Sequence, residues 1–258
     1  MTASRPDRGL RWLALGLAPT LLLAAGFAAA APPSPYEARY SLYRNDKFTG
    51  ESVVRFEVDG DRWTVTSETQ GTRGLARLLR AHNTERSTGR LEGDRFQPEA
   101  YEHAFTSVGV DQEWAADFDW AAGEVRTRTE DGEFTLPLEA GTYDPLALDL
   151  ALRRSLREDI AEWQGRLVDE DEIDTQRYRV EPPSRLDTAL GCLDAIRVDR
   201  VRENSRRYTR VWYAPSLDYA AVLVEHGKTG ENHMAMKLES ITLDGTAVRP
   251  GRACDEAP

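Results

Sequence analysis

Histidine is the first side chain to consider for metal chemistry, and the chain has four, at positions 82, 103, 226 and 233. A zinc site needs three or four ligands from His, Cys, Asp or Glu. The histidines form no pair four residues apart, and no HExxH motif is present. His226 and His233 would approach each other if they flank a hairpin turn at 228–232, where a carboxylate could join them; a plain surface hairpin is the alternative. The sequence predicts no metal and no cofactor.

Carboxylates are the next candidates for chemistry. The run at 169–174 holds five of them but no glycine. A calcium loop needs oxygen ligands at fixed spacing and a glycine, so this run predicts a solvated turn or strand edge. Asp117 and Asp119 would share one face of a strand, as a glycosidase pair requires, but in so acidic a chain such pairs arise by chance. No GxSxG, SxxK or phosphate-binding glycine loop is present, so no catalytic residue is predicted.

Aromatic side chains are the remaining signal for binding. Six lie on predicted strands: Trp63, Trp114, Trp120, Trp212, Tyr213 and Tyr219. They either pack in a β core or line an apolar cavity that holds a lipid tail. The candidates for such a cavity are Trp63, Trp114, Trp212 and Tyr213. Alternation places Trp212 on the face opposite Val211 and Tyr213.

The N-terminal 31 residues have the pattern of a cleavable export signal. Three arginines precede an apolar run, Trp12–Phe27, and alanines at 28–31 follow before two prolines. A retained membrane anchor is the alternative. No cysteine lies near the cleavage region, so no lipoprotein anchor is expected. We therefore expect a periplasmic protein with no membrane span after cleavage.

Charge and cysteine content set further limits on partners. The net charge of −11 becomes −13 when the +2 of residues 1–31 is removed. Such an acidic chain is not expected to bind nucleic acid, or to bind anionic lipid tightly through its net charge. The only cysteines are Cys192 and Cys254. In an exported chain they are candidates for a disulfide that pins the C-terminal tail; two independent thiols are the alternative.

The elements that position these residues are mainly strands, because polar and apolar residues alternate from Tyr36 onward. The segments 54–58 and 63–65 flank an Asp59–Asp61 turn and predict a hairpin. Similar segments are predicted at 95–106, 108–119, 123–130, 165–173, 176–182, 192–202, 206–214, 219–227 and 233–243. Many short strands at this spacing are typical of an antiparallel sandwich, barrel or roll.

Two helices are expected to interrupt the strands. The longer, at about 144–159, begins with Asp144 as N-cap and Pro145 in the first turn. Its leucines recur every four residues, and Arg153, Arg154 and Arg157 are expected to face water. The shorter, Leu75–Arg80, is too short to be stable alone. We predict a mainly β fold, an antiparallel β roll or open barrel-like sheet with the longer helix packed on it. Residues 32–250 would form one domain and 251–258 a tail.

Four motifs, taken in order, resemble one family of bacterial envelope proteins. They are YEARYSLY at 36–43 with the following Gly50, YDPL at 143–146, GCLDAIRVDRV at 191–201 and YTRVWYAPSLDYAAVLV at 208–224. The resemblance is to the domain-of-unknown-function 3108 family and spans roughly 36–245. It implies an exported β-rich fold and no assigned activity. The family's general form is similar to the helix-plugged rolls of periplasmic lipoprotein carriers. The cysteine pair departs from many members, so the resemblance does not imply the disulfide.

Three interpretations of function follow. The first is a non-enzymatic envelope protein that binds a lipid, another apolar or amphipathic ligand, or an envelope protein through its β roll. It predicts a closed apolar cavity with the longer helix as lid. The second is a structural or interaction module with a filled core. The third is a hydrolase of envelope glycans or lipids, which needs a convergent catalytic constellation that linear spacing does not show.

Overall fold

The computed structural model describes residues 34–203, 205–231 and 233–255, so the predicted export signal at 1–31 lies outside the described residues. The strands are β1 (Tyr36–Arg44), β2 (Lys47–Asp59), β3 (Arg62–Gly71), β4 (His82–Glu92), β5 (Arg95–Ser107), β6 (Val110–Asp119), β7 (Glu124–Thr129), β8 (Gly132–Pro137), β9 (Thr142–Tyr143), β10 (Glu162–Asp169), β11 (Glu172–Val180), β12 (Ser184–Thr188), β13 (Gly191–Val201), β14 (Arg207–Ala214), β15 (Ala220–Lys228), β16 (His233–Leu243) and β17 (Thr246–Ala247). The helices are α1 (Gly74–Leu78), α2 (Pro145–Ser155) and the 3-10 turn η1 (Pro215–Leu217).

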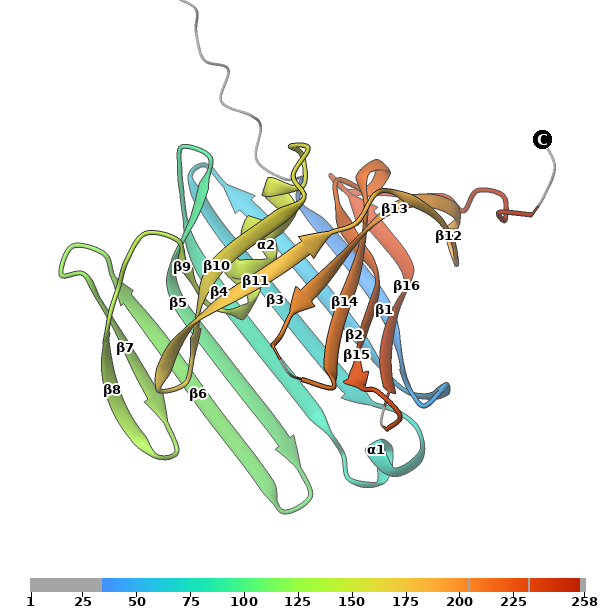
Figure 1. Ribbon diagram of the computed structural model, residues 1–258. Helices are drawn as coiled ribbons and strands as arrows, with labels where there is room; N and C mark the ends of the chain where they lie inside the picture. Colours follow the sequence, from blue (N-terminus) through green and yellow to red (C-terminus); the bar gives the residue numbers. More distant parts are fainter. Residues whose placement is uncertain (1–33, 204, 232, 256–258) are drawn as a thin grey trace, which may run out of the picture. The chain divides into compact units, whose positions relative to one another are not determined.

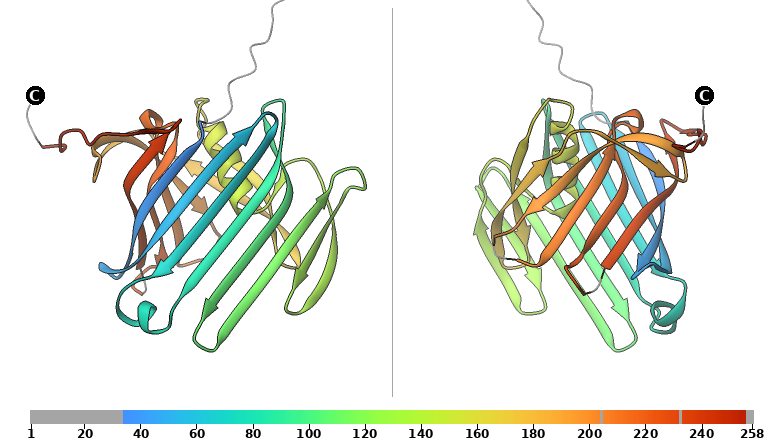
Figure 2. Two further views of the ribbon diagram at one scale, coloured as in Figure 1. Left: turned by 180° about the vertical axis from the view of Figure 1, so that it is seen from behind. Right: turned by 45° about the vertical axis from the view of Figure 1, so that its right-hand side comes forward.

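The strands form one large open sheet that is almost wholly antiparallel (Figure 1). Strand β1 pairs with β2 on one side and with β16 on the other. From β2 the order continues through successive hairpins to β8, and from β16 through β15, β14, β13 and β11 to β10. The one parallel pairing among the described strands joins β9 to β10. Among the described strands β8 pairs only with β7, and not with β9 or β10, so the sheet curls without closing (Figure 2).

This architecture confirms the predicted mainly β, antiparallel fold and corrects its detail. The hairpin around Asp59–Asp61 is β2–β3, with Phe56 opposite Val65. Strands β4, β8, β9, β12 and β17 were not predicted, and the predicted strand 165–173 spans the turn between β10 and β11. Because the sheet stays open, it presents a concave face in place of the closed cavity that the lid interpretation predicted.

The two faces of the sheet differ sharply in polarity. One register row, Phe56, Val65, Ser87, Tyr101 and Ala116, is buried on the concave face. The neighbouring row, Arg55, Thr66, Arg86, Glu102 and Ala115, lies on the outer face, because successive strand residues point to opposite sides. A single buried face of this kind needs a partner, and α2 supplies it.

Helix α2 starts where the sequence predicts and ends a turn early. Asp144 caps it, its Oδ1 accepting from the backbone N–H of Leu146 and Ala147 at 2.9 Å each. The helix ends at Ser155, not near 159 as predicted. After Ser155 the N–H groups of Arg157 and Glu158 bond three residues back, which tightens the last turn and redirects the chain toward β10. The apolar stripe continues past this end, because Ile160 packs against the same cluster as Leu152 and Leu156.

The helix binds three core clusters into one interior. Ala147 and Leu150 belong to the cluster of β1–β3 and β14–β16, and Leu152 and Leu156 to that of β13–β14. Leu146 packs against both the first cluster and the third, around β5–β7. One amphipathic helix therefore supplies apolar contacts to opposite arms of the open sheet.

The expectation that Arg153 faces water is wrong, because its side chain is only 2% exposed. Its Nη1 donates to the Tyr36 hydroxyl at 2.7 Å and its Nη2 to the carbonyl of Asp218 at 3.2 Å. The guanidinium also stacks on the Tyr36 ring, 4.6 Å from its centroid. Asp149 supplies a nearby negative charge and accepts from the Tyr213 hydroxyl at 2.6 Å. This polar network fastens α2 to β1, η1 and β14.

The cysteines form a disulfide between Cys192 and Cys254. It is accompanied by backbone bonds from Cys192 N to the Arg252 carbonyl at 2.7 Å and from Gly251 N to the Leu190 carbonyl at 2.8 Å. Gly191 has φ +93°, and its backbone packs against Gly251 so closely that a Cβ would lie 2.7 Å from the Gly251 carbonyl carbon. The bridge therefore holds residues 251–254 against the β12–β13 hairpin.

Asp144 should make stability depend on pH. Burial raises its pKa to about 6 from an ordinary 3.8, although the bonds from Ser87 and the backbone act in the opposite direction. Because the folded pKa lies above the unfolded one, the contribution of Asp144 is full below about pH 4 and is lost as pH rises through about 6. We expect Asp144→Asn to gain about 3 kcal/mol relative to the parent chain between pH 4 and 7. Urea unfolding at several pH values measures this, and a pH-independent difference would contradict it.

Arg153 should carry much of the stability of α2. Arg153→Met leaves Asp149 without its buried cationic neighbour and the Tyr36 hydroxyl without its donor. We expect a loss of about 3–5 kcal/mol in the free energy of unfolding. Arg154→Met removes the same charge at the next, half-buried position and should cost under about 1 kcal/mol. Equal losses for the two variants would show that the network does not anchor the helix.

Candidate functional site

The concave face of β13–β16 and β1 carries an apolar row next to α2. The row consists of Val198, Val211, Val224, Met236 and Leu42, which face one another in register across the five strands. Val198 is 1% exposed and packs with Leu152 of α2. The other four are only half-buried. The row is therefore sealed by the helix at one end and partly accessible over the rest of its length.

The same face becomes cationic two residues further along these strands. Arg202 donates from Nη2 to Thr209 Oγ1 at 3.1 Å, and that oxygen lies 3.0 Å from Nδ1 of His226. Arg200 faces Tyr178 of β11 in register and follows Val198 by two residues. Arg207 precedes Thr209 by two residues and so lies on the same face. We call Arg200, Arg202, Arg207 and His226 the cationic cluster.

The positive charges of this cluster act on one another. Burial, and then the charge of Arg200, lowers the pKa of Arg202. Burial also lowers the pKa of His226, followed by the charges of Arg202, Arg207 and Arg200. Within the described residues no carboxylate forms an ion pair with any of the four; the neighbouring Glu203 and Glu231 pair with other cations. The cluster therefore produces a local positive electrostatic potential on an acidic protein.

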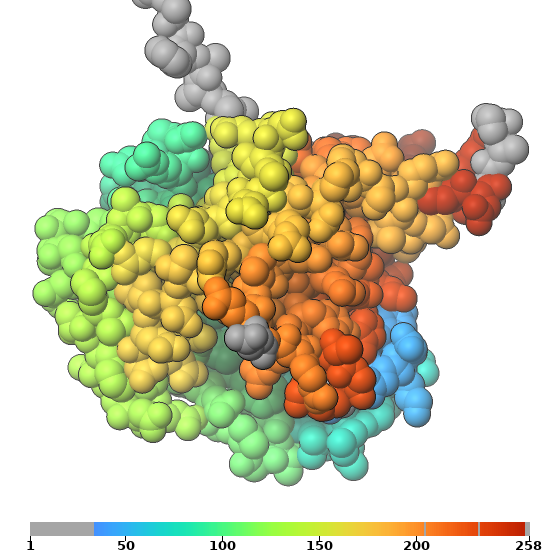
Figure 3. Space-filling view, in the orientation of Figure 1, coloured from blue at the N-terminus to red at the C-terminus, as the bar shows by residue number. Residues whose placement is uncertain are grey.

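Two nitrogens of the cluster are buried and have no acceptor. They are Nε of Arg200 and Nη1 of Arg202, considering hydrogen bonds among the described residues. An unpaired buried N–H is costly, so an acceptor from a ligand would be stabilised here. A hollow of about 380 Å³ adjoins the cluster at Arg207 and His226. It is lined also by Arg44, Gly227, Lys228, Glu231 and Met234. The surface is also hollowed between the gold β10–β11 segment and the orange β13–β15 segment (Figure 3).

The opposite arm of the concave face is polar and aromatic. The Tyr101 hydroxyl donates to Glu85 Oε1 at 2.8 Å, and Trp114 packs on Tyr101 with ring centroids 4.6 Å apart. His103 Nε2 lies 2.7 Å from Oδ1 of Asn83, while its Nδ1 is buried and has no partner among the described residues. Burial, and then the charge of Glu85, raises the pKa of Tyr101. These side chains are placed by strands β4, β5 and β6.

The four aromatic candidates from the sequence do not converge on one site. Trp63 is 2% exposed, donates to the Arg90 carbonyl at 3.0 Å and packs edge-on against Phe96. Trp114 belongs to the cluster around β5–β7, and Tyr213 belongs to the cluster of β13–β14. Trp212 is half-buried and packs against the cluster of Trp63, on a different side from Tyr213, as alternation predicts.

The polar candidates are likewise separate. His226 contacts Thr209, and His233 contacts the Tyr208 hydroxyl at 2.7 Å, so the two histidines use opposite faces of the hairpin. Asp117 pairs with Arg128 at 2.5 Å, whereas Asp119 accepts from the Ala122 N–H in a turn. The acidic run forms the exposed β10–β11 turn. In the described part of the chain no three His, Cys, Asp or Glu side chains are grouped to hold a metal ion.

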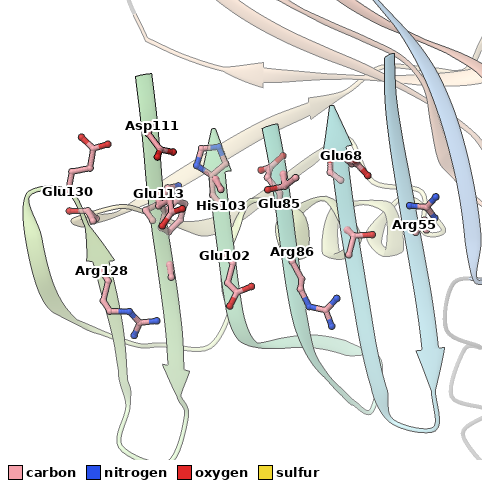
Figure 4. A pocket seen from close by; sticks show the side chains of 17 residues that line it. Arg55, Glu68, Glu85, Arg86, Glu102, His103, Asp111, Glu113, Arg128 and Glu130 are labelled. Carbon is pink, nitrogen blue, oxygen red and sulfur yellow. The ribbon is translucent and has the colours of Figure 1, made fainter. Parts of the chain in front are cut away.

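A larger hollow, a trough of about 1020 Å³, crosses the outer face of β2–β7. Arg55, Arg86 and Arg128 lie along one margin with Glu102 among them, and Glu68 and Glu113 lie along the other (Figure 4). Two of the arginines already pair with carboxylates, Arg55 with Glu37 and Arg128 with Asp117. Most of the trough is thus a solvated polar sheet face whose basic margin is largely neutralised.

Comparison with known proteins places the chain in a family. The model of a protein family of unknown function, DUF3108, matches residues 36–229. The chain belongs to the DUF3108 family. The match confirms the resemblance seen in the sequence motifs. Comparison with curated proteins finds no match.

Solved structures support the fold of this DUF3108 protein. A β-barrel-like protein of the domain of unknown function DUF1849 from Brucella abortus aligns with a TM-score of 0.55 at 13% identity, covering 83% of this chain and 99% of that one. A Bacteroides fragilis protein with a YmcC-like fold aligns with a TM-score of 0.30 at 10% identity, over 82% and 97% of the two chains. The first similarity shows a shared fold; the second is too distant to support an argument. As for membrane crossing, the helices among the described residues lack the length and apolarity that it requires.

Sequence reasoning missed the cationic cluster, although a signal was present. Val198, Arg200 and Arg202 fall on one strand face by alternation, so the pattern shows an apolar face turning cationic at the end of β13. The arginines beside them, Arg197 and Arg210, lie on the other face and pair with carboxylates. The two sets of arginines carry the same charge. They differ in the face of the strand from which they project and in whether a carboxylate pairs with them.

Proposed function

We propose that this protein is a non-enzymatic envelope protein that binds an amphiphile with an anionic head group on its concave face. The observation that carries the proposal is the apolar row, which is partly accessible and ends at a cationic cluster that has no carboxylate partner among the described residues. Arg200 and Arg202 are half-buried, and a protein that used them only for folding would be expected to pair them with carboxylates or to expose them.

The arrangement gives each part of such a ligand a distinct partner. Guanidinium groups bind carboxylate or phosphate oxygens through charge-assisted, often bidentate hydrogen bonds. The alkyl part would cover the half-buried side chains of Val211, Val224 and Leu42, at roughly 25 cal/mol per Å² of apolar surface. Because Leu152 of α2 packs on Val198, the chain of the ligand would point toward the helix and its head toward the open end.

The proposal includes export to the periplasm. The support is the leader pattern at 1–31 and the disulfide, which is typical of oxidising compartments. Residues 32–250 would then act as one domain, with the bridged tail held against it.

A second candidate is an interaction module that holds an envelope protein in the outer trough. Its support is the size of the trough and the unpaired carboxylate of Glu113 within the described residues. The ligand experiment below separates the candidates, because the trough and the cationic cluster share no side chain.

Ligand binding should depend on the head group and on two arginines. We expect dodecanoate to bind about tenfold or more tightly than dodecanol, because only the former offers a charged carboxylate that accepts charge-assisted hydrogen bonds from Arg200 and Arg202. Arg200→Gln/Arg202→Gln should remove this preference and leave dodecanol binding unchanged. Isothermal titration calorimetry measures both.

The matched control is Arg177→Gln/Arg210→Gln, which removes the same charge from the outer faces of β11 and β14. It should retain the preference for dodecanoate. If neither ligand binds, the proposal fails; if both bind alike to the parent chain, the head-group role of the arginines fails.

Organic extracts of the chain purified from the envelope should contain an anionic lipid by mass spectrometry.

The leader should be removed during export. The chain expressed with its own N-terminus should be recovered from the periplasmic fraction with a mass that begins near Pro32. Replacing Leu21 and Leu22 by Arg should block export, because a signal needs an uninterrupted apolar run. A full-length chain in the cytosol would contradict the proposed compartment.

A further inference from the structure

Large apolar side chains are exposed together at one end of the sheet. Leu75, Leu78 and Leu79 of the α1 loop are 65%, 73% and 37% exposed. Val108 and Val110 of the β5–β6 turn are 61% and 41% exposed. The two segments touch, since Val108 N donates to the Leu79 carbonyl at 2.8 Å. We call these five residues the apolar tip. In Figure 1 α1 and the β5–β6 turn lie at the same lower end.

The apolar stripe of α1 faces away from the sheet. Leu75, Leu78 and Leu79 are spaced i, i+3, i+4, which places them on one helix face. The sheet side of α1 is occupied by Ala76, packed so closely on Gly71 that a Cβ there would lie 2.7 Å from the Ala76 Cβ. The helix is therefore anchored by its smallest side chain and presents its largest ones to solvent, the reverse of a core-facing helix.

The loop that carries the tip is held firmly by backbone bonds. The N–H groups of Thr72 and Arg73 donate to the Thr49 carbonyl at 3.0 and 3.1 Å. Ala81 N donates to the Ala76 carbonyl at 3.0 Å, and Gly71 N to the Ala81 carbonyl at 2.8 Å. These bonds fix the direction of the leucines, so their exposure belongs to the fold.

Three arginines surround the leucines. Arg73, Arg77 and Arg80 lie in the same loop, and none forms an ion pair within the described part of the chain. Arg73 lies over the Phe48 ring, 5.7 Å from its centroid. The nearest carboxylate row on β3 ends at Glu68, which lies 3.3 Å from His82. The tip is thus a basic, apolar spot on a chain of net charge −11.

We propose that the apolar tip docks on an anionic lipid bilayer, with the leucines in the interface and the arginines on the head groups. Leucine and arginine interleaved on one short amphipathic segment is the composition of interfacial membrane contacts. A convex tip of five side chains is small for a stable protein interface, which buries about 800 Å² on each partner. Arginines near an anionic surface contribute about fivefold each to binding. This proposal does not depend on the amphiphile site.

Vesicle co-sedimentation tests the proposal. The chain is expressed with its own leader and purified from the envelope, with its N-terminus checked by mass. We expect binding to vesicles containing phosphatidylglycerol, little binding to pure phosphatidylcholine, and weaker binding as salt rises. Leu75→Ser/Leu78→Ser should weaken binding about tenfold or more. Arg77→Gln/Arg80→Gln should weaken it about 25-fold.

A charge-matched control is Arg62→Gln/Arg95→Gln. It removes two arginines beside the β2–β3 and β4–β5 turns, at the end of these strands that lies away from α1. It should bind like the parent chain. All variants lie at exposed positions, and unchanged thermal unfolding verifies the fold. Equal binding by the Leu75→Ser/Leu78→Ser chain, or no vesicle binding by the parent, would overturn the proposal. Cross-linking of Leu78→benzoylphenylalanine to an envelope protein, without vesicle binding, would instead assign the tip to a protein partner.

Discussion

The burial of α2 on the concave face is the constraint on which the rest of the structure depends. An open sheet with one apolar face cannot be stable in water unless that face is covered. Helix α2 covers it with five apolar side chains and two polar anchors, the N-cap Asp144 and the interior Arg153. The polar anchors set position, because each has partners on a different part of the sheet: Ser87 on β4, Tyr36 on β1 and Asp218 after η1.

The length of α2 also decides what remains open. The helix has only eleven residues, so it covers the sheet near Val198 and Tyr213 and leaves the ends of β13–β16 uncovered. There the concave face keeps half-buried apolar residues and then turns cationic. Helix α2 ends near Asp218, at the opposite end of these strands, where Arg153 and Arg157 contact that residue. The open region is therefore left by where the short helix lies on the sheet.

The edges of the sheet bear on the same point. Among the described strands β8 and β9 do not pair with each other, and the chain continues from β9 into α2 instead of adding a closing strand. A closed barrel would have removed both edges but would also have fixed the interior volume. The curled open sheet keeps its core in three clusters joined by a helix, which is consistent with the barrel-like form of the Brucella abortus protein.

The proposed membrane contact and the proposed ligand site lie toward the same end of the sheet. This end holds the C-terminal end of β13 and the loop that contains α1 (Figure 1). Both combine apolar and cationic side chains in an acidic protein. They differ in construction: the cluster of Arg200 and Arg202 is half-buried on a concave wall, and the tip of Leu75 and Leu78 is convex and exposed. One suits a single molecule and the other a surface.

The sequence by itself determined the strand class, the start of α2 and the leader pattern, because alternation, capping and an apolar run are local properties. It missed β4, whose concave side carries Asn83, Glu85 and Ser87 in place of apolar residues, so no alternation is visible. Tertiary structure alone decided that Arg153 is interior and that Cys192 meets Cys254. It also decided that Arg197 pairs with a carboxylate, whereas Arg200 pairs with none in the described part of the chain. These depend on which distant segments meet, and pairing across a sheet is set by long-range packing that no local pattern contains.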